Sequence, residues 1–170
     1  MKMKINLLLL FLFVITIIFC SCKKSGNDEV HHISCENLLT DTAGTFENAR
    51  IYLPTAFTPN NDGRNDIARP FRYDISSFVF AIYDRTNALV YTTSQAGDGW
   101  NAPISANTAT VYYYRIQAIT NSNHHIAMCG ELNYLICRPS SNQLTDFYFE
   151  DQLTSAGFSG TTGENLAVCP

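Results

Sequence analysis

Residues 110–137 read TVYYYRIQAITNSNHHIAMCGELNYLIC, in which two runs rich in aromatic and β-branched residues flank a short polar segment. The first run alternates like a half-buried β-strand, whose side chains point in turn to the two faces of a sheet. One face would carry Tyr112, Tyr114, Ile116 and Ala118, and the other Tyr113, Arg115 and Gln117. The polar residues 121–124 are typical of a turn, so we expect the run from Ile126 to Cys137 to return as the antiparallel partner.

Shorter apolar runs upstream extend the same pattern. Residues 77–84 and 89–92 flank a four-residue turn, in which Asn87 suits a positive φ, so they predict a β-hairpin. Residues 51–53 predict a further strand that ends at Pro54. The 9 Tyr and 11 Phe of the chain also favour strands. Because no convincing amphipathic helix accompanies these runs, the sequence predicts an all-β, antiparallel β-sandwich.

Residues 1–21 have the features of a signal peptide for export. A basic start is followed by an apolar run that ends at Phe19 and is shorter than the roughly 20 residues of a membrane span. Ser21 and Cys22 then resemble the lipobox of bacterial lipoproteins, which implies cleavage before Cys22 and acylation of this cysteine. Cys20 fits less well, because it follows the bulky Phe19. The alternatives are an uncleaved anchor or an ordinary secretory signal.

The remaining composition indicates an acidic envelope protein. Residues 22–49 are polar and predict a lipid-anchored tether. The chain has 11 basic and 15 acidic residues; removal of residues 1–21 takes away two lysines, which leaves 9 against 15 and a net charge of −6. Without a basic stripe, we expect no nucleic-acid partner. Residues 140–170 form an acidic and aromatic tail that we expect to pack on the sandwich.

Four cysteines remain after Cys20 and Cys22 are set aside. They are Cys35, Cys129, Cys137 and Cys169. An even number in an exported chain predicts disulfides, and four cysteines allow three connectivities. We expect Cys35 and Cys169 to pair with Cys129 and Cys137 in an order that the sequence leaves open. Such pairing would tie both ends of the chain to the sandwich.

Residues 53–66 read LPTAFTPNNDGRND and closely resemble the opening of the gliding motility-associated C-terminal domain. The resemblance continues through residues 78–91, through Gly-Trp-Asn at residues 99–101 and into the last two strands, and it covers residues 50–139. It implies an immunoglobulin-like sandwich of about seven strands, here with disulfide-tied N- and C-terminal arms. In that family the domain commonly serves as a sorting signal for the type IX secretion system. The extension to Pro170 leaves a second role open, as a standalone fold.

Within that segment, the polar residues 60–66 form the best candidate for a binding site. Oxygen ligands around a glycine suit calcium, and an EF-hand-like alignment would supply Asn60, Asp62, the carbonyl of Arg64, and Asp66. The first and twelfth positions of that alignment are poor, which excludes a complete EF-hand. The alternative is a pair of Asx-turns that fix the loop between two strands.

Trp100 is the second candidate, beside the turn formed by residues 97–99. An exposed indole would suit stacking on a sugar ring. The alternative is a core residue of the sandwich, which is what its counterpart in the family pattern implies.

No motif of a catalytic nucleophile or of a zinc protease is present, so we expect no enzyme. The sequence therefore predicts a lipoprotein attached to the outer membrane, on its periplasmic or surface side. Its sandwich would be a structural or protein-interaction module connected with gliding, adhesion or type IX secretion, with an envelope or surface protein as partner. The alternative is a calcium-dependent module that binds a surface glycan.

Overall fold

The computed structural model describes residues 33–41, 48–104, 109–140 and 142–170, which belong to one compact unit. The predicted signal peptide, Cys22 and most of the tether lie outside these residues. Within the described ranges, no helix has the length and apolar character that a membrane span needs.

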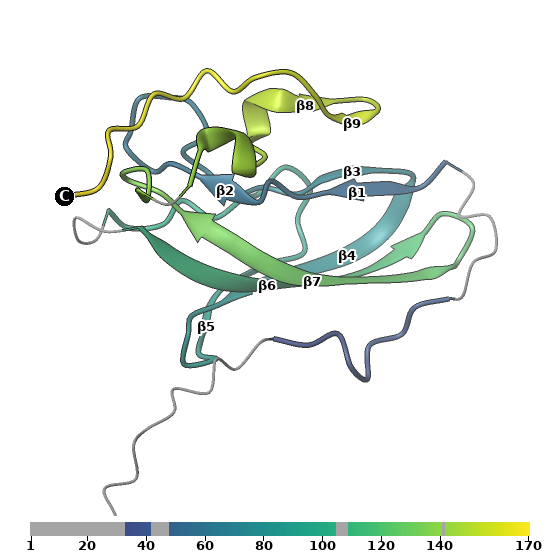
Figure 1. The fold of residues 1–170 in the computed structure, drawn as a ribbon. Helices are drawn as coiled ribbons and strands as arrows, with labels where there is room; N and C mark the ends of the chain where they lie inside the picture. Colours follow the sequence, from purple (N-terminus) through teal and green to yellow (C-terminus); the bar gives the residue numbers. More distant parts are fainter. Residues whose placement is uncertain (1–32, 42–47, 105–108, 141) are drawn as a thin grey trace, which may run out of the picture. The chain divides into compact units, whose positions relative to one another are not determined.

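The main layer is a five-stranded sheet in the order β2-β7-β6-β4-β5 (Figure 1). It contains β2 (Ala56–Phe57), β4 (Ile75–Tyr83), β5 (Leu89–Thr93), β6 (Thr110–Thr120) and β7 (His125–Tyr134). Adjacent strands of this sheet are antiparallel, except that β2 pairs in parallel with the end of β7. The two predicted hairpins are thus present, and β6 and β4 pair with each other at the centre of the sheet.

Short strands and turns cover the inner face of this sheet. β1 (Arg50–Tyr52) pairs with β3 (Phe71–Tyr73), and β8 (Leu153–Thr154) pairs with β9 (Gly157–Phe158). Two 3₁₀ turns, Leu144–Asp146 and Glu150–Gln152, complete the elements. The predicted all-β sandwich is confirmed. The described residues contain nine strands rather than about seven, because strands of two or three residues are too short to show an alternating pattern.

The core lies between these two layers. Ile116 and Ala118 of β6 face it, as predicted, with Phe78, Phe80 and Ile82 of β4 beside them. Gly130 of β7 also faces inward, opposite Tyr114. A Cβ atom at residue 130 would lie 2.9 Å from the Tyr114 ring, so the glycine makes room for this aromatic side chain.

Disulfides tie both ends of the described chain to β7 or to the residues just after it. The bond between Cys35 and Cys129 holds the N-terminal arm, residues 33–41, and the bond between Cys137 and Cys169 holds the C-terminal tail, residues 140–170. The predicted disulfide-tied arms are therefore present. In Figure 1 the arm (purple) and the tail (yellow) lie on opposite sides of the five-stranded sheet.

Candidate functional site

The polar loop that follows β2 is held by its own side chains. The Asp66 carboxylate accepts hydrogen bonds from the backbone N–H groups of Asn61 (2.7 Å) and Gly63 (2.8 Å). The Asp62 carboxylate accepts one from the backbone of Arg64 (2.8 Å) and one from the side-chain amide of Asn60 (3.1 Å). The bond from Arg64 to Asp62, with a second of 2.9 Å from the backbone N–H of Asp62 to the side-chain carbonyl of Asn60, forms the pair of Asx-turns that the sequence offered as an alternative to a metal site.

These hydrogen bonds affect the prediction that the loop of residues 60–66 binds calcium. Asp62 and Asp66 direct their oxygens at donors of the loop, and the carbonyl of Arg64 accepts a hydrogen bond of 3.3 Å from the Thr58 hydroxyl. A calcium ion would have to displace these donors, because it needs the same oxygen atoms. Calcium binding by Asn60, Asp62, Arg64 and Asp66 stays a prediction of the sequence that this hydrogen bonding disfavours.

The C-terminal tail closes over this loop. Oε1 of Glu164 accepts hydrogen bonds from the Thr58 hydroxyl (2.8 Å) and the Asn65 side-chain amide (2.9 Å). All three side chains are buried. The guanidinium of Arg64 donates to the carbonyl of Gly163 at 2.7 Å, so the tail is attached to both ends of the loop.

Burial governs the charge of Glu164. The loss of solvent raises the pKa of its carboxyl group, and the nearby carboxylates of Asp62 and Asp151 act in the same direction. The hydrogen bonds from Asn65 and Thr58 oppose this shift, because they stabilise the charged form. The net effect is a buried carboxyl group that holds its proton more strongly than an ordinary glutamate.

A second set of contacts fixes the tail farther along the loop. Arg69 forms an ion pair with Glu150 at 2.6 Å. The side-chain carbonyl of Asn65 accepts a hydrogen bond of 2.9 Å from the backbone of Asp151, and the Asp151 carboxylate in turn accepts one of 2.7 Å from Gly163. The tail and the loop thus form one continuous network of hydrogen bonds.

Apolar contacts beneath the tail strengthen this closure. Phe147 and Phe149 are buried against Ala56 and Leu135 in a small second core. Tyr148, between them, is 51% exposed and stacks on Phe158 of β9. The tail therefore packs on its own domain through alternate aromatic side chains, as a strand does.

Trp100 lies inside the sandwich. It is 7% exposed and contacts Phe57 and Tyr112, whose ring centroids lie 5.5 and 4.7 Å from its own. Its backbone forms a two-way bridge with Ala68. The possibility that Trp100 is an exposed stacking residue for sugars is therefore corrected, because its ring is enclosed by other aromatic residues; it is a core residue.

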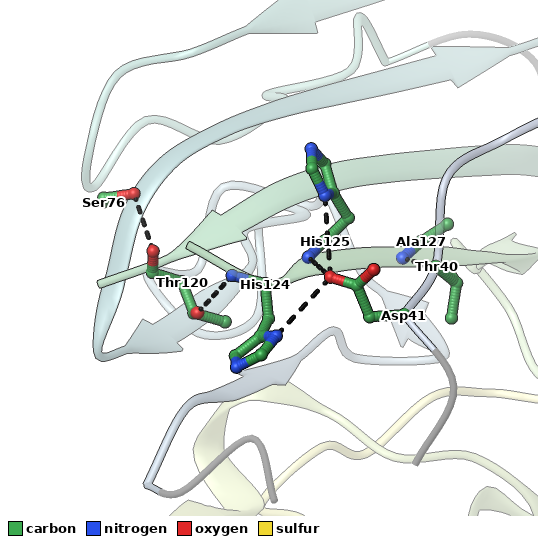
Figure 2. Close-up of polar contacts among 7 residues, drawn as sticks. All are labelled: Thr40, Asp41, Ser76, Thr120, His124, His125 and Ala127. Carbon is green, nitrogen blue, oxygen red and sulfur yellow. Dashed lines mark hydrogen bonds and ion pairs between the residues drawn. The ribbon is translucent and has the colours of Figure 1, made fainter. Parts of the chain in front are cut away.

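The N-terminal arm binds the free part of the β7 edge, and Figure 2 shows its last contacts. Asp41 exchanges hydrogen bonds with the backbone of His125, and the Thr40 hydroxyl accepts one from Ala127. One Asp41 oxygen also lies 3.6 Å from Nδ1 of both His124 and His125. The backbone hydrogen bond from His125, together with the two nearby imidazoles, lowers the pKa of Asp41.

Sequence reasoning did not find the residues that join the tail to the loop. The sequence marks Glu164 and Glu150 only as part of an acidic tail, Asn65 only as a letter of the family motif, and Thr58 only as the poor first position of the EF-hand-like alignment. Their contacts join residues 81 to 106 positions apart, and no local pattern marks such pairs.

Comparison with known proteins gives one match. The family model described as CHU_C Type IX secretion signal domain matches residues 51–131. No curated protein and no solved structure matches the chain. The matched region includes the loop and the central strands, and the tail from residue 140 lies beyond it.

Proposed function

Because residues 51–131 are a type IX secretion signal domain, we propose that this protein is a non-enzymatic lipoprotein of the cell envelope whose sandwich binds a protein partner. The family relates the module to type IX secretion and the chain to the envelope or the exterior of the cell. A lipid at Cys22 would hold it at the outer membrane. The partner would belong to the secretion, gliding or adhesion apparatus.

The family match is the observation that carries this proposal, since a signal domain acts by being recognised by another protein. Two features of the chain support it. The export signal and the lipobox-like Ser21-Cys22 precede the domain, and paired cysteines suit an oxidising compartment. The polar groups of the family motif are also engaged by the tail, as expected for a structural element rather than an open substrate cleft.

The lipid anchor is tested with two neighbouring cysteines. We expect Cys22→Ala to abolish labelling with a radioactive fatty acid and to release the protein from the membrane fraction. Cys20→Ala is the matched control and should remain labelled and membrane-bound. Labelling that survives Cys22→Ala would contradict the anchor.

The link to secretion is tested by protease shaving of intact cells, with blotting for this protein. If type IX secretion handles the chain, the protein should be digested in the parent strain and protected in a strain that lacks the secretion apparatus. Equal digestion, or equal protection, in the two strains would argue against this link.

A further inference from the structure

The large sheet has one edge that the rest of the described chain leaves open. At β2, the tail follows the edge: the backbone N–H groups of Thr55 and Ala56 donate to the carbonyl of Tyr148, at 2.9 and 3.2 Å. At the free part of β7, the N-terminal arm contacts His125 and Ala127. At the opposite edge stands β5, and no strand of the described residues pairs with its outer side.

β5 lacks the charges and prolines that protect many exposed strand edges, but its pairing with β4 shifts register, because Ile82 pairs with Tyr91 and Tyr83 with Leu89, which leaves Val90 between them. Natural edges carry lysine, proline or an inward charge, because unpaired N–H and C=O groups otherwise attract another strand. β5 reads Leu-Val-Tyr-Thr-Thr and contains no charge and no proline. Leu89 and Val90 are 54% and 40% exposed. This edge is therefore chemically suited to accept a further strand.

A groove beside β5 extends this surface over the outer face of the sheet. One part is lined by Val79, the last residues of β5 and Asp98, and the next part combines Val79, Ile119 and Leu39 of the N-terminal arm with polar residues such as Gln117 and His125. Val79 and Leu39 are 48% and 71% exposed. A strand added at β5 would place alternate side chains toward this mixed surface, in which Val79 and Leu39 are the exposed apolar residues.

We propose that β5 is a docking edge for an extended, uncharged segment of a partner protein, which joins the sheet by strand addition. Main-chain hydrogen bonds to residues 89–93 would hold the segment, and small or β-branched side chains would contact Val79 and Val90. An acidic residue near the end of β5 would meet the carboxylate of Asp98, and β5 itself carries no charge that could pair with a charged residue. The identity of the partner rests on the proposed function, whereas the assignment of β5 as a docking edge does not.

A second copy of this chain is a weaker occupant. β5 has only five residues, and a stable protein interface buries about 1,200–2,000 Å². Two paired strands of this length, about 17 Å each, cover far less than that. An extended segment of a larger partner can bind such a short edge transiently while the rest of the partner makes other contacts.

The test uses the full chain, purified in detergent, and a short peptide of alternating threonine and valine. Amide hydrogen exchange of residues 89–93 should slow about tenfold or more at saturating peptide, because those N–H groups or their neighbours become paired. The same peptide with N-methyl groups on alternate residues keeps its side chains and loses the donors, so it should give no protection.

Variants of two valines distinguish pairing of the peptide at the β5 edge from its non-specific binding to exposed apolar residues. We expect Val90→Lys to weaken peptide binding about tenfold, and Val168→Lys, at a valine of similar exposure (48%) in the tail, to leave it unchanged. Val90→Thr, which keeps the β-branched shape, should still bind.

Three results would overturn the proposal: binding of the N-methylated peptide, protection at β2 instead of β5, or no protection at all. A dimer in sedimentation that Val90→Lys dissociates would assign the edge to a second copy and would also overturn it. Because the assay contains neither membrane nor secretion apparatus, its outcome is independent of the tests of lipidation and secretion.

Discussion

The Glu164 carboxylate accepts a hydrogen bond of 2.8 Å from the hydroxyl of Thr58, a residue 106 positions earlier in the chain. This contact joins the acidic tail to the first residue after β2, within the family motif. It makes the tail part of the folded domain, so changes in either segment should affect the stability of the other.

Glu164→Ala should lower stability. It removes the acceptor of the buried Asn65 amide and the shorter of the two bonds of the Thr58 hydroxyl, and an unsatisfied buried polar group costs about 1–3 kcal/mol. Thermal unfolding should show a midpoint lowered by several degrees. Glu164→Gln keeps a side-chain carbonyl for the same donors and is the control. A wild-type midpoint for the alanine variant would show that the network is dispensable.

The raised pKa of Glu164 predicts a dependence of stability on pH. The folded protein binds this proton more tightly than the unfolded chain, in which a glutamate has a pKa of about 4.3. The contribution to stability is therefore largest below that pH and decreases as the pH rises through the raised value. Relative to Glu164→Gln, the free energy of unfolding of the wild type should fall as the pH rises from the ordinary pKa of a glutamate through the raised value. A difference that stays constant over this range would contradict the shift.

Gly130→Ala should destabilise the β6–β7 hairpin. The added Cβ would lie 2.9–3.1 Å from two ring atoms and the hydroxyl oxygen of Tyr114, and overpacking of a core typically costs about 1–3 kcal/mol. Denaturant unfolding measures this loss. In the Tyr114→Ala background the ring is absent, so the same change at Gly130 should cost much less. Equal losses in the two backgrounds would exclude the ring as the cause.

Removal of the disulfides should destabilise the protein to different degrees. The bonds join residues separated by 94 positions (Cys35 and Cys129) and 32 positions (Cys137 and Cys169). From the chain entropy of the unfolded state, we expect losses of about 4–5 and about 3–4 kcal/mol for the paired serine variants. Chemical unfolding in reductant should bring the wild type to the level of the variant that lacks both bonds. A larger loss for the shorter loop would contradict the entropic explanation.

Calcium should have no effect on the loop of residues 60–66. Both oxygens of Asp62 and of Asp66 already accept hydrogen bonds from the loop, and a hard cation would have to replace those donors. We expect millimolar calcium to leave both the unfolding midpoint and the fluorescence of the buried Trp100 unchanged. A saturable change in either would favour the calcium-dependent alternative, with Asp66→Asn as the variant that should then lose it.

The sequence predicted those parts of the fold that have a local signal. The alternation in β6 and β4 identified the inward residues Ile116 and Phe80, because a strand that is half buried repeats every two residues. β2 escaped prediction, because two residues cannot show a period and its pairing with β7 is parallel and distant in the chain.

The candidate site was predictable only in part. Its Asx-turns follow from the short side chains of Asn60 and Asp62, which bond to backbone groups two residues away. The covering tail depends on contacts between distant residues, such as Arg69 with Glu150, which only the folded chain brings together. The burial of Trp100 likewise follows from the surrounding rings of Phe57 and Tyr112.

The two disulfides join the cysteines of the domain in consecutive order, Cys35 with Cys129 and then Cys137 with Cys169. A chain that crosses a membrane from its N-terminus presents these thiols one after another. An oxidant that couples each newly exposed cysteine to the preceding unpaired one would join Cys35 to Cys129 and then Cys137 to Cys169. The first bond could form before Cys169 has emerged. If Cys20 is removed with the signal peptide and Cys22 is acylated before Cys35 emerges, this consecutive pairing lets an oxidase form both native bonds without a disulfide isomerase.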